Sequence, residues 1–456
     1  MAPEDRESAF RSFLSAWTGE GAAIDTSSIL HGTTTFIVRS FDREALQFSF
    51  PLLVRRNLLH ETGLDPAGSD GAVAALIERV KEQAQRTPEF GPLYGSGVAG
   101  SLRYRDTIEP YTVIHSDEAI GTALWKADAR NFCDRSGVHL IIRGALPCPQ
   151  GSSGSDTEVE RLLADLAQGV SDSIQNAPLL PLRAAWIASL DQKMLRQQLP
   201  ALGLVSFVGD GSHLARSFTQ HRPFFRVAGP RDGVSIPFAC PADLGPVEVE
   251  LPASGRTVTG LGIRMKEVFA VAGSNAQGKT TFLEGILAGM DDHLPHDGRE
   301  RVVTVRGACT AESTNMGLAG ADISMFFHAL PPGVSGTVKG AFGAGSGSMS
   351  MAHQMQTAIA RRSPLLIIDE DRAAPNLLVR SCLQKEEITP LAEILARQRE
   401  MMGDTALVFA ACAMDTLIAQ ADRIMVLDRH VALAIEPAEF RRQVAALLRK
   451  TAGEME

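Results

Sequence analysis

One short segment in the middle of the chain carries the clearest chemical signature. From Gly273 onward, two glycines frame four other residues and are followed by a lysine and a threonine, the spacing G-x-x-x-x-G-K-T. Glycines let a loop turn its backbone N–H groups around phosphate oxygens, the lysine neutralises phosphate charge, and the threonine hydroxyl can bind Mg²⁺. The segment therefore predicts a site for ATP and magnesium. The residues expected to contact the nucleotide are Gly273, Ser274, Asn275, Ala276, Gln277, Gly278, Lys279, Thr280 and Thr281.

The segments on both sides of this loop agree with that prediction. Residues 268–272 are all apolar, as in a buried strand, and run directly into the loop. A helix is expected to begin at Thr280, where its positive dipole end faces the phosphates. Lys279 would then contact the β- and γ-phosphates, and Thr280 would bind the metal ion. The alternative is a glycine-rich turn between a strand and a helix that binds nothing.

A pair of acids supplies the second chemical feature. Residues 365–368 are apolar and precede Asp369 and Glu370, as expected where a central strand delivers carboxylates at its C-terminal edge. Asp369 would hold Mg²⁺ through water, and Glu370 would polarise the attacking water. The alternative is a structural strand end with two solvated acids. With the loop upstream, the pair predicts ATP hydrolysis, with Glu370 and Lys279 as catalytic residues.

A glycine-serine segment lies between these two motifs. Residues 343–348 have the sequence Gly-Ala-Gly-Ser-Gly-Ser, and residues 349–361 follow with Met351 and Met355 on one helical face. The pattern predicts a loop that opens a helix, which makes a second anion-binding helix N-terminus shortly before the acidic strand. The alternative is a flexible linker.

The composition is that of a globular protein. Hydrophobic residues make up 45% and charged residues 21% of the 456 residues, a length that predicts two or three domains. No run is long and apolar enough to predict a membrane span. The formal net charge of −9 argues against a surface covered in positive potential, as general nucleic-acid binding would need. The net charge is still compatible with a local basic groove.

The N-terminus and the cysteines indicate the compartment. The first residues mix acids with Arg6 and Arg11, which fits neither a signal peptide nor an acid-poor transit peptide. The six cysteines are scattered, without a C-x-x-C pair or a histidine at zinc-ligand spacing, so we expect reduced, mostly buried thiols. A cytoplasmic location is the default expectation, with an organelle as the open alternative.

The pattern of segments predicts an α/β protein in three parts. Residues 1–195 are expected to form an N-terminal α+β domain, residues 196–435 a P-loop domain with a mostly parallel sheet, and residues 436–456 a C-terminal helix. The principal strands are expected at residues 34–38, 138–142, 204–208, 247–251, 268–272, 365–368, 405–409 and 423–428. The principal helices are expected at residues 73–85, 156–176, 349–361 and 437–450.

Residues from about 195 to 430 resemble a known family, the predicted ATPases of the ABC class, which is widespread in bacteria and includes a kinetoplastid mitochondrial RNA-editing factor. The resemblance continues more weakly back to about residue 110. It implies an ABC nucleotide-binding domain with an N-terminal extension, assembled as a head-to-tail homodimer with two ATP sites. In the editing factor, the extension forms a basic RNA-binding pore. The segments that carry the resemblance are residues 203–211, 251–256, 295–300, 322–324 and 369–376.

The resemblance assigns roles by position. Lys279 and Thr280 match the ligands of phosphate and Mg²⁺, Asp369 matches the Walker B acid, and Glu370 matches the base. A further group matches the signature motif, which reaches the γ-phosphate held by the partner subunit. Its members are Ser346, Gly347 and Ser348.

The sequence departs from the family pattern at several positions. Arg372 follows the acids where the family usually has threonine or serine, and Ser381 replaces an aspartate. ABC proteins generally place a switch histidine after the strand at 405–409 and the resembled family tends to have glycines there, whereas residues 410–413 are Ala-Ala-Cys-Ala. These departures favour a divergent, slow ATPase. Asp322 lies about where a Q-loop glutamine would be, and its alternative role is that of a helix N-cap.

One basic stretch favours an alternative function. Arginines and histidines are interleaved there with phenylalanines, a pattern that could neutralise and stack single-stranded RNA. The chain would then be an RNA-binding factor whose nucleotide site is regulatory or structural. The competing interpretation is a solvated loop with core aromatics, and the sequence does not indicate a client for either function. The stretch comprises His213, Arg216, Phe218, His221, Arg222, Phe224, Phe225, Arg226 and Arg231.

Overall fold

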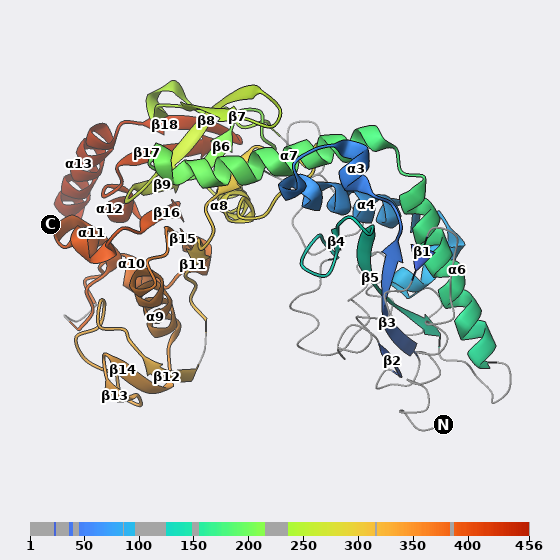
Figure 1. The fold of residues 1–456 in the computed structure, drawn as a ribbon. Helices are drawn as coiled ribbons and strands as arrows, with labels where there is room; N and C mark the ends of the chain where they lie inside the picture. The colour runs from blue at the N-terminus through green and yellow to red at the C-terminus, as the bar shows by residue number, and fades with distance from the viewer. Residues whose placement is uncertain are drawn as a thin grey trace. The chain divides into compact units, whose positions relative to one another are not determined.

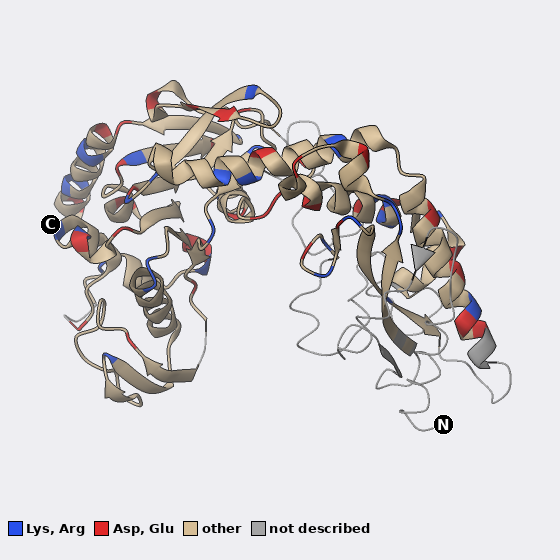
Figure 2. Ribbon diagram, viewed as in Figure 1, with Lys and Arg blue, Asp and Glu red and all other residues tan. Residues whose placement is uncertain are grey.

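The structure is a computed structural model that describes residues 22–23, 36–39, 45–84, 86–95, 125–147, 155–214, 236–314, 317–383 and 387–455. The described part divides into two compact units, one up to Asp191 and the other from Gln192 onward (Figure 1). Acidic and basic residues are interspersed along the helices of both units (Figure 2). Within the described ranges, no helix has the length and apolar character needed to cross a membrane.

The first unit is built on an antiparallel sheet with strand order β1-β3-β5-β4, and β2 pairs with β3. Its long central pair joins β3 to β5 over their full lengths. The strands are β1 (Ala22–Ala23), β2 (Phe36–Arg39), β3 (Ala45–Val54), β4 (Phe132–Cys133) and β5 (Val138–Pro147). The helices are α3 (Leu58–Thr62), α4 (Ser69–Ala84) and α6 (Ser155–Gln175), with 3₁₀ turns at Pro66–Gly68 and Pro88–Tyr94. Helix α7 (Leu179–Gln198) begins in this unit, and its residues from Gln192 onward belong to the second unit.

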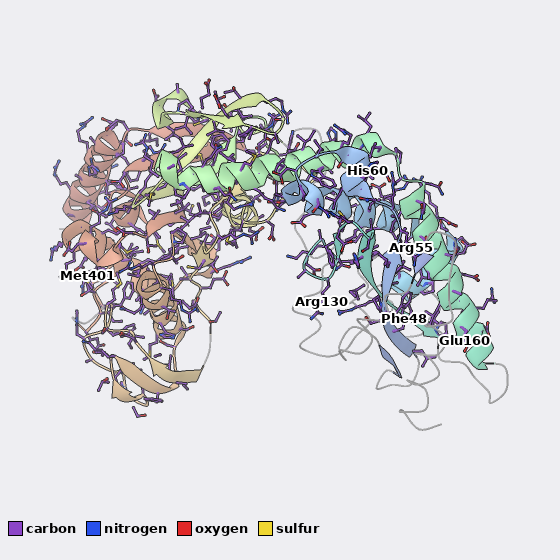
Figure 3. All side chains as sticks on the ribbon, viewed as in Figure 1. Phe48, Arg55, His60, Arg130, Glu160 and Met401 are labelled. Carbon is purple, nitrogen blue, oxygen red and sulfur yellow. The ribbon has the colours of Figure 1, made fainter. Side chains whose placement is uncertain are left out.

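Alternation along β3 explains the core of this unit. Phe48, Phe50 and Leu52 occupy every second position and are buried, because successive side chains of a strand point to opposite faces. Phe48 is labelled among the side chains in Figure 3. Trp186 of α7 is fully buried in the same core, and its indole N–H donates to the carbonyl oxygen of Asp65 at 2.7 Å. The unit therefore has a hydrophobic core of its own.

The second unit is built on a six-stranded sheet with order β11-β15-β16-β9-β17-β18. All its pairs are parallel except β17 with β18, so the prediction of a mostly parallel sheet is confirmed. The strands are β9 (Val268–Ala272), β11 (Cys309–Thr310), β15 (Leu365–Asp369), β16 (Ala406–Ala411), β17 (Arg423–Asp428) and β18 (Val431–Ile435). The helices are α8 (Lys279–Ala288), α9 (Gly347–Ala360), α10 (Pro375–Leu378), α11 (Leu391–Arg397), α12 (Asp415–Ile418) and α13 (Pro437–Met455).

Both faces of this sheet are buried. Along β9, Ala270 lies in one hydrophobic cluster with the methionines of α9, whereas Phe269 and Val271 lie in a second cluster with Phe282 of α8. Strands covered on both faces have continuous apolar runs, which is the pattern of β9, β15 and β16 in the sequence. The second cluster also contains residues of an antiparallel sheet with order β10-β6-β8-β7. Its strands are β6 (Leu204–Gly209), β7 (Val247–Leu251), β8 (Arg256–Arg264) and β10 (Val302–Thr304).

A small antiparallel sheet with order β12-β14-β13 was not predicted. Its strands are β12 (Gly317–Ala321), β13 (Ser335–Thr337) and β14 (Gly340–Ala344). The prediction of a loop over residues 343–348 is wrong at both ends, because Gly343 and Ala344 end β14 and Gly347 and Ser348 begin α9. These strands are rich in glycine and mostly exposed, so they lack the apolar alternation by which strands are predicted.

The expectation for the cysteines needs a similar correction. Cys133 is buried, but Cys382 and Cys412 are exposed, so burial does not hold for most of the described thiols. All described cysteines are free. Burial raises the pKa of the Cys133 and Cys240 thiols to about 11, which keeps both protonated near neutral pH.

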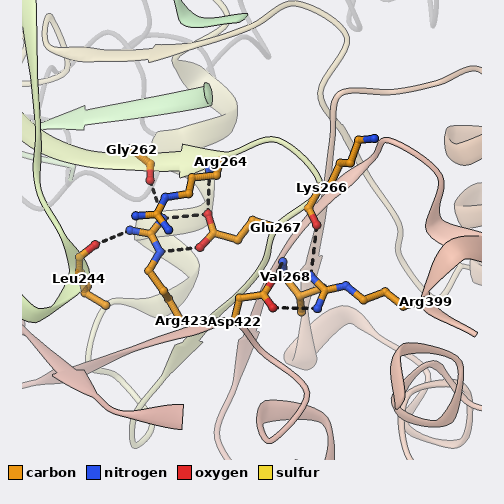
Figure 4. Close-up of polar contacts among 9 residues, drawn as sticks. All are labelled: Leu244, Gly262, Arg264, Lys266, Glu267, Val268, Arg399, Asp422 and Arg423. Atoms are coloured by element: carbon orange, nitrogen blue, oxygen red, sulfur yellow. Dashed lines mark hydrogen bonds and ion pairs between the residues drawn. The ribbon is translucent and has the colours of Figure 1, made fainter. Parts of the chain in front are cut away.

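Two ion pairs lie at the N-terminal ends of β9 and β17, and that of Arg423 also reaches β8 of the antiparallel sheet (Figure 4). Arg423 Nε donates to Glu267 at 2.5 Å, and Nη2 donates to the carbonyl oxygen of Gly262 at 2.6 Å. Asp422 accepts from the N–H of Val268 and from Arg399. Burial would raise the pKa of Asp422, but these hydrogen bonds and the two arginine charges outweigh it and lower the pKa.

We expect Arg423→Met to lower the free energy of unfolding by about 3–5 kcal/mol, because it leaves a buried carboxylate without its partner. The side chain of Glu267 is only 4% exposed and that of Arg423 11%. Urea unfolding followed by circular dichroism measures the loss. Arg442→Met is the control, because its pair with Glu439 is 70% and 47% exposed and should leave stability unchanged. Equal effects of the two substitutions would contradict the assignment.

Candidate functional site

The phosphate loop, residues 273–281, includes the connection of β9 to α8 at the C-terminal edge of the six-stranded sheet and the first three residues of α8. The helix begins at Lys279, and Gly278 is its N-cap residue with φ 100°. Gly273 and Ala276 also have positive φ, 133° and 61°. A β-carbon on Gly273 would lie 2.4 Å from the carbonyl oxygen of Leu427 on β17, so only glycine fits at this position.

Lys279 lies against the backbone of the loop. Its Nζ donates to the carbonyl oxygens of Gly273 at 2.8 Å and Ser274 at 2.9 Å. The ammonium group can therefore exchange carbonyl oxygens for phosphate oxygens while it stays at the loop. Among the other loop residues, the exposed ones are Ser274, Asn275 and Ala276, and the half-buried ones are Gln277, Gly278, Thr280 and Thr281.

One hydrogen bond joins the loop to the acidic motif. Thr280 Oγ1 donates to Asp369 Oδ2 at 2.7 Å, although the two residues are 89 positions apart. Asp369 ends β15, and β16 lies between β15 and β9. A hydroxyl and a carboxylate are hard oxygen donors, and Mg²⁺ is commonly held by one or two carboxylates together with substrate phosphates. The residues present fit a magnesium ion bound with a nucleotide.

The described ranges contain no group of three or more His, Cys, Asp or Glu side chains that could hold a metal ion alone. A metal ion at Thr280 and Asp369 would therefore depend on phosphate oxygens for further ligands.

Glu370 begins the 3₁₀ turn Glu370–Arg372, directly after Asp369. Its carboxylate accepts a hydrogen bond from the backbone N–H of Cys412. Cys412 follows β16, at the position where ABC proteins generally place a switch histidine. A backbone amide meets the carboxylate instead, and it holds Glu370 at the same sheet edge as the phosphate loop.

An ion-pair cluster beside the acids was not predicted from the sequence. Arg372 pairs with Glu312 at 3.1 Å and with Glu284 of α8 at 3.4 Å. The hydrogen bond to Glu312 raises the pKa of the guanidinium, as do the charges of Glu312, Glu284 and Asp369, while partial burial opposes the shift. Glu312 follows the short strand β11, which pairs with β15. A strand of two residues leaves no pattern in the sequence, so nothing there indicated Glu312.

The serine-glycine segment begins helix α9, and this part of the prediction is confirmed. Ser346 is the N-cap residue, and its hydroxyl lies 3.1 Å from that of Ser348. Gly347 is packed closely, because a β-carbon there would lie 2.0 Å from Oγ of Ser313. Among the described residues, no hydrogen bond joins this segment to the phosphate loop of the same chain.

Asp322 is not a helix N-cap. Its carboxylate accepts from the N–H of Ser324 at 2.9 Å and from the hydroxyl at 2.7 Å, which stabilises a turn after β12. His353 of α9 contacts the carbonyl oxygen of Asp322 through Nδ1 at 3.2 Å.

In the basic stretch, residues 216–231 lie outside the described residues. The N–H of His213 donates to the carbonyl oxygen of Gly298 at 2.8 Å.

Residues 181–454 match the family model of the ABC ATPase, described as a P-loop domain. The chain belongs to the ABC ATPase family. A relative in Methanocaldococcus jannaschii, an uncharacterized protein, is 38% identical over 379 residues, which cover 83% of this chain and 82% of the relative. The resemblance found in the sequence is therefore confirmed, and this ABC ATPase has the nucleotide-binding fold of the family.

Solved structures similar to this ABC ATPase include two proteins from ABC transporters. One is cbiO1 of Clostridium perfringens, part of the ABC transporter complex cbiONQ, with 15% identity, a TM-score of 0.30, and coverage of 46% of this chain and 97% of that chain. The other is a nucleotide-free ATP-binding cassette from an ABC transporter, with 14% identity, a TM-score of 0.27, and coverage of 41% and 87%.

We expect Gly273→Ala to lower the free energy of unfolding by at least about 2 kcal/mol, because it adds both a close contact and an unfavourable φ. Gly255→Ala is the matched control: its φ is 66°, but no atom lies within 4 Å of the added carbon. Its loss should be about 1 kcal/mol. Urea unfolding of both variants measures the difference, and similar losses would show that Leu427 does not constrain the loop.

Proposed function

We propose that this ABC ATPase binds ATP with magnesium at residues 273–281 and hydrolyses it. The observation that carries the proposal is the hydrogen bond between Thr280 and Asp369, which brings the phosphate loop and the acidic strand end to one place. The backbone of the loop supports it, since three residues with positive φ turn the chain around the start of α8. A helix N-terminus offers unpaired N–H groups and a positive dipole end to phosphate.

In this proposal each charged residue has a separate task. Lys279 leaves the two loop carbonyls and neutralises the β- and γ-phosphates, while Thr280 and Asp369 hold the metal ion. Bound magnesium would supply charge neutralisation at the phosphates. Glu370 orients the attacking water and accepts its proton, and the Cys412 amide keeps this carboxylate in place. Slow turnover is proposed because the position after β16 offers a backbone amide where a histidine side chain is expected.

We further propose that the nucleotide is closed in by a second copy of the chain. Ser346, Gly347 and Ser348 form an exposed to half-exposed helix N-terminus, which suits contact with a phosphate. Their hydrogen bonds do not reach the loop of the same chain, which favours a head-to-tail homodimer in which they face the loop of the partner. Nucleotide binding and hydrolysis would then close and open the dimer.

The domain division proposed for this cycle is an N-terminal domain of residues 1–195, an ATPase domain of residues 196–435 and a C-terminal helix of residues 436–456. The N-terminal domain would transmit the nucleotide state to a partner. The alternative of an RNA-binding factor depends on residues 216–231, which lie outside the described residues. No described contact favours it, and ATP hydrolysis is the function proposed.

We expect Glu370→Gln to lower the rate of ATP hydrolysis by at least about 100-fold while the affinity for MgATP stays within about twofold, because only the base is lost. Phosphate release and calorimetric titration measure the two quantities. Glu400→Gln, at an exposed glutamate outside the site, is the control and should keep both. Lys279→Ala should abolish the heat of MgATP binding. If MgATP gives no heat of binding that Lys279→Ala removes, the proposal is wrong.

We expect Glu370→Gln to form a stable dimer in MgATP, because blocked hydrolysis prolongs the closed state. Light scattering after size-exclusion chromatography measures the mass with and without nucleotide. The double variant with Ser348→Arg should stay monomeric, since an arginine would fill the space that the proposal gives to the partner's nucleotide. A monomer of Glu370→Gln that nevertheless binds MgATP would rule out the two-subunit site while leaving the nucleotide site intact.

A further inference from the structure

The turn between β17 and β18 has an unusual backbone for its sequence. β17 ends at Asp428 and β18 begins at Val431, so Arg429 and His430 alone form the turn. Both have positive φ, 49° and 67°. Two-residue hairpin turns with positive φ at both positions strongly prefer Asn-Gly, because a side chain clashes with the backbone in that region. A strained backbone of this kind persists only where surrounding contacts hold it.

The contacts that hold this turn come from the phosphate loop. The backbone N–H of Arg429 donates to Oε1 of Gln277 at 2.5 Å. His430 Nδ1 lies 3.2 Å from the carbonyl oxygen of Gln277. A carbonyl oxygen can only accept, so the proton of the imidazole is on Nδ1. The turn therefore binds one residue of the loop by its side chain and by its main chain.

The position of Gln277 in the loop gives these two contacts their importance. It directly precedes Gly278, the N-cap of α8, and Lys279. Without nucleotide, Lys279 ties the first part of the loop through the carbonyls of Gly273 and Ser274. When Lys279 turns to a phosphate, these two ties are released. The ties from Arg429 and His430 involve neither the lysine nor the inward N–H groups of the loop, so they are compatible with bound phosphate.

We propose that the Arg429–His430 turn positions the phosphate loop, and that His430 is a positioning residue for nucleotide binding. This inference rests on the proposed function, because it assigns the turn a role at the same nucleotide site. The strain at these two residues is retained because the backbone N–H of Arg429 and the imidazole Nδ1 of His430 both reach Gln277. A glycine at position 430 would relax the backbone but would remove the Nδ1 donor.

Three substitutions separate strain from the hydrogen bond. His430→Ala removes the donor and keeps the strain, His430→Gly removes both, and His430→Asn supplies an amide donor on a residue that tolerates positive φ. Arg362→Gly is the matched control for strain relief alone, because Arg362 has φ 54° at the end of α9. Hydrogen exchange of the 273–281 amides without nucleotide, the affinity for MgATP and the Tm are measured for each.

We expect His430→Ala and His430→Gly to speed exchange of the loop amides about threefold or more and to weaken MgATP binding about three- to tenfold, as loss of one hydrogen bond would. His430→Asn should restore both quantities. His430→Gly should nevertheless melt at a higher temperature than His430→Ala, as relief of strain predicts. The Tm would then rise from His430→Ala to His430→Gly while the MgATP affinity stays low in both, which a purely structural turn does not explain. Arg362→Gly should change only the Tm.

Two results would overturn the proposal. The first is unchanged loop exchange and MgATP affinity in His430→Ala and His430→Gly. The second is recovery of affinity in His430→Gly together with its higher Tm, because strain alone would then explain the effect. The proposed function fails in a different way: the unsubstituted protein would not bind MgATP, while the exchange of loop amides would still report whether the turn holds the loop.

Discussion

The hydrogen bond between Thr280 and Asp369 depends on the whole arrangement of the ATPase unit. It forms because β9 and β15 run parallel, lie on either side of β16 and end at the same sheet edge. Neighbouring parallel strands need long crossover connections, and here α8 and α9 lie within such connections and bury opposite faces of the sheet. A shift of β16 relative to either neighbour would separate the threonine from the aspartate and remove the oxygen pair that fits magnesium.

Ion pairs and residues with positive φ are distributed differently between the two ends of this sheet. At the N-terminal ends of β9 and β17 lie the buried ion pair of Arg423 with Glu267 and the more exposed pair of Arg399 with Asp422. At the C-terminal ends, the non-glycine residues Ala276, Arg429 and His430 have positive φ, and at the N-terminal end of β9 Lys266 has φ 61°. Strain of this kind is typical of sites where a ligand is held by a preformed backbone.

Relative to the family pattern, this ABC ATPase differs most around Glu370. A backbone amide at Cys412 meets the carboxylate where a histidine is expected, and Arg372 adds a cation that two glutamates neutralise. Both changes keep the acids at the sheet edge and alter their electrostatic surroundings. A main-chain N–H cannot accept or carry a proton as an imidazole can.

The sequence by itself determined the phosphate loop, the apolar strands and the order of motifs, because these are local patterns. Glycine spacing and five apolar residues at 268–272 are visible without knowledge of neighbours. The glycine-rich sheet and the contacts of Glu370 with Cys412, Arg372 with Glu312, and Gln277 with His430 were decided only by the tertiary structure. Each joins residues far apart in the chain, and strand order, which no local pattern encodes, brings them together.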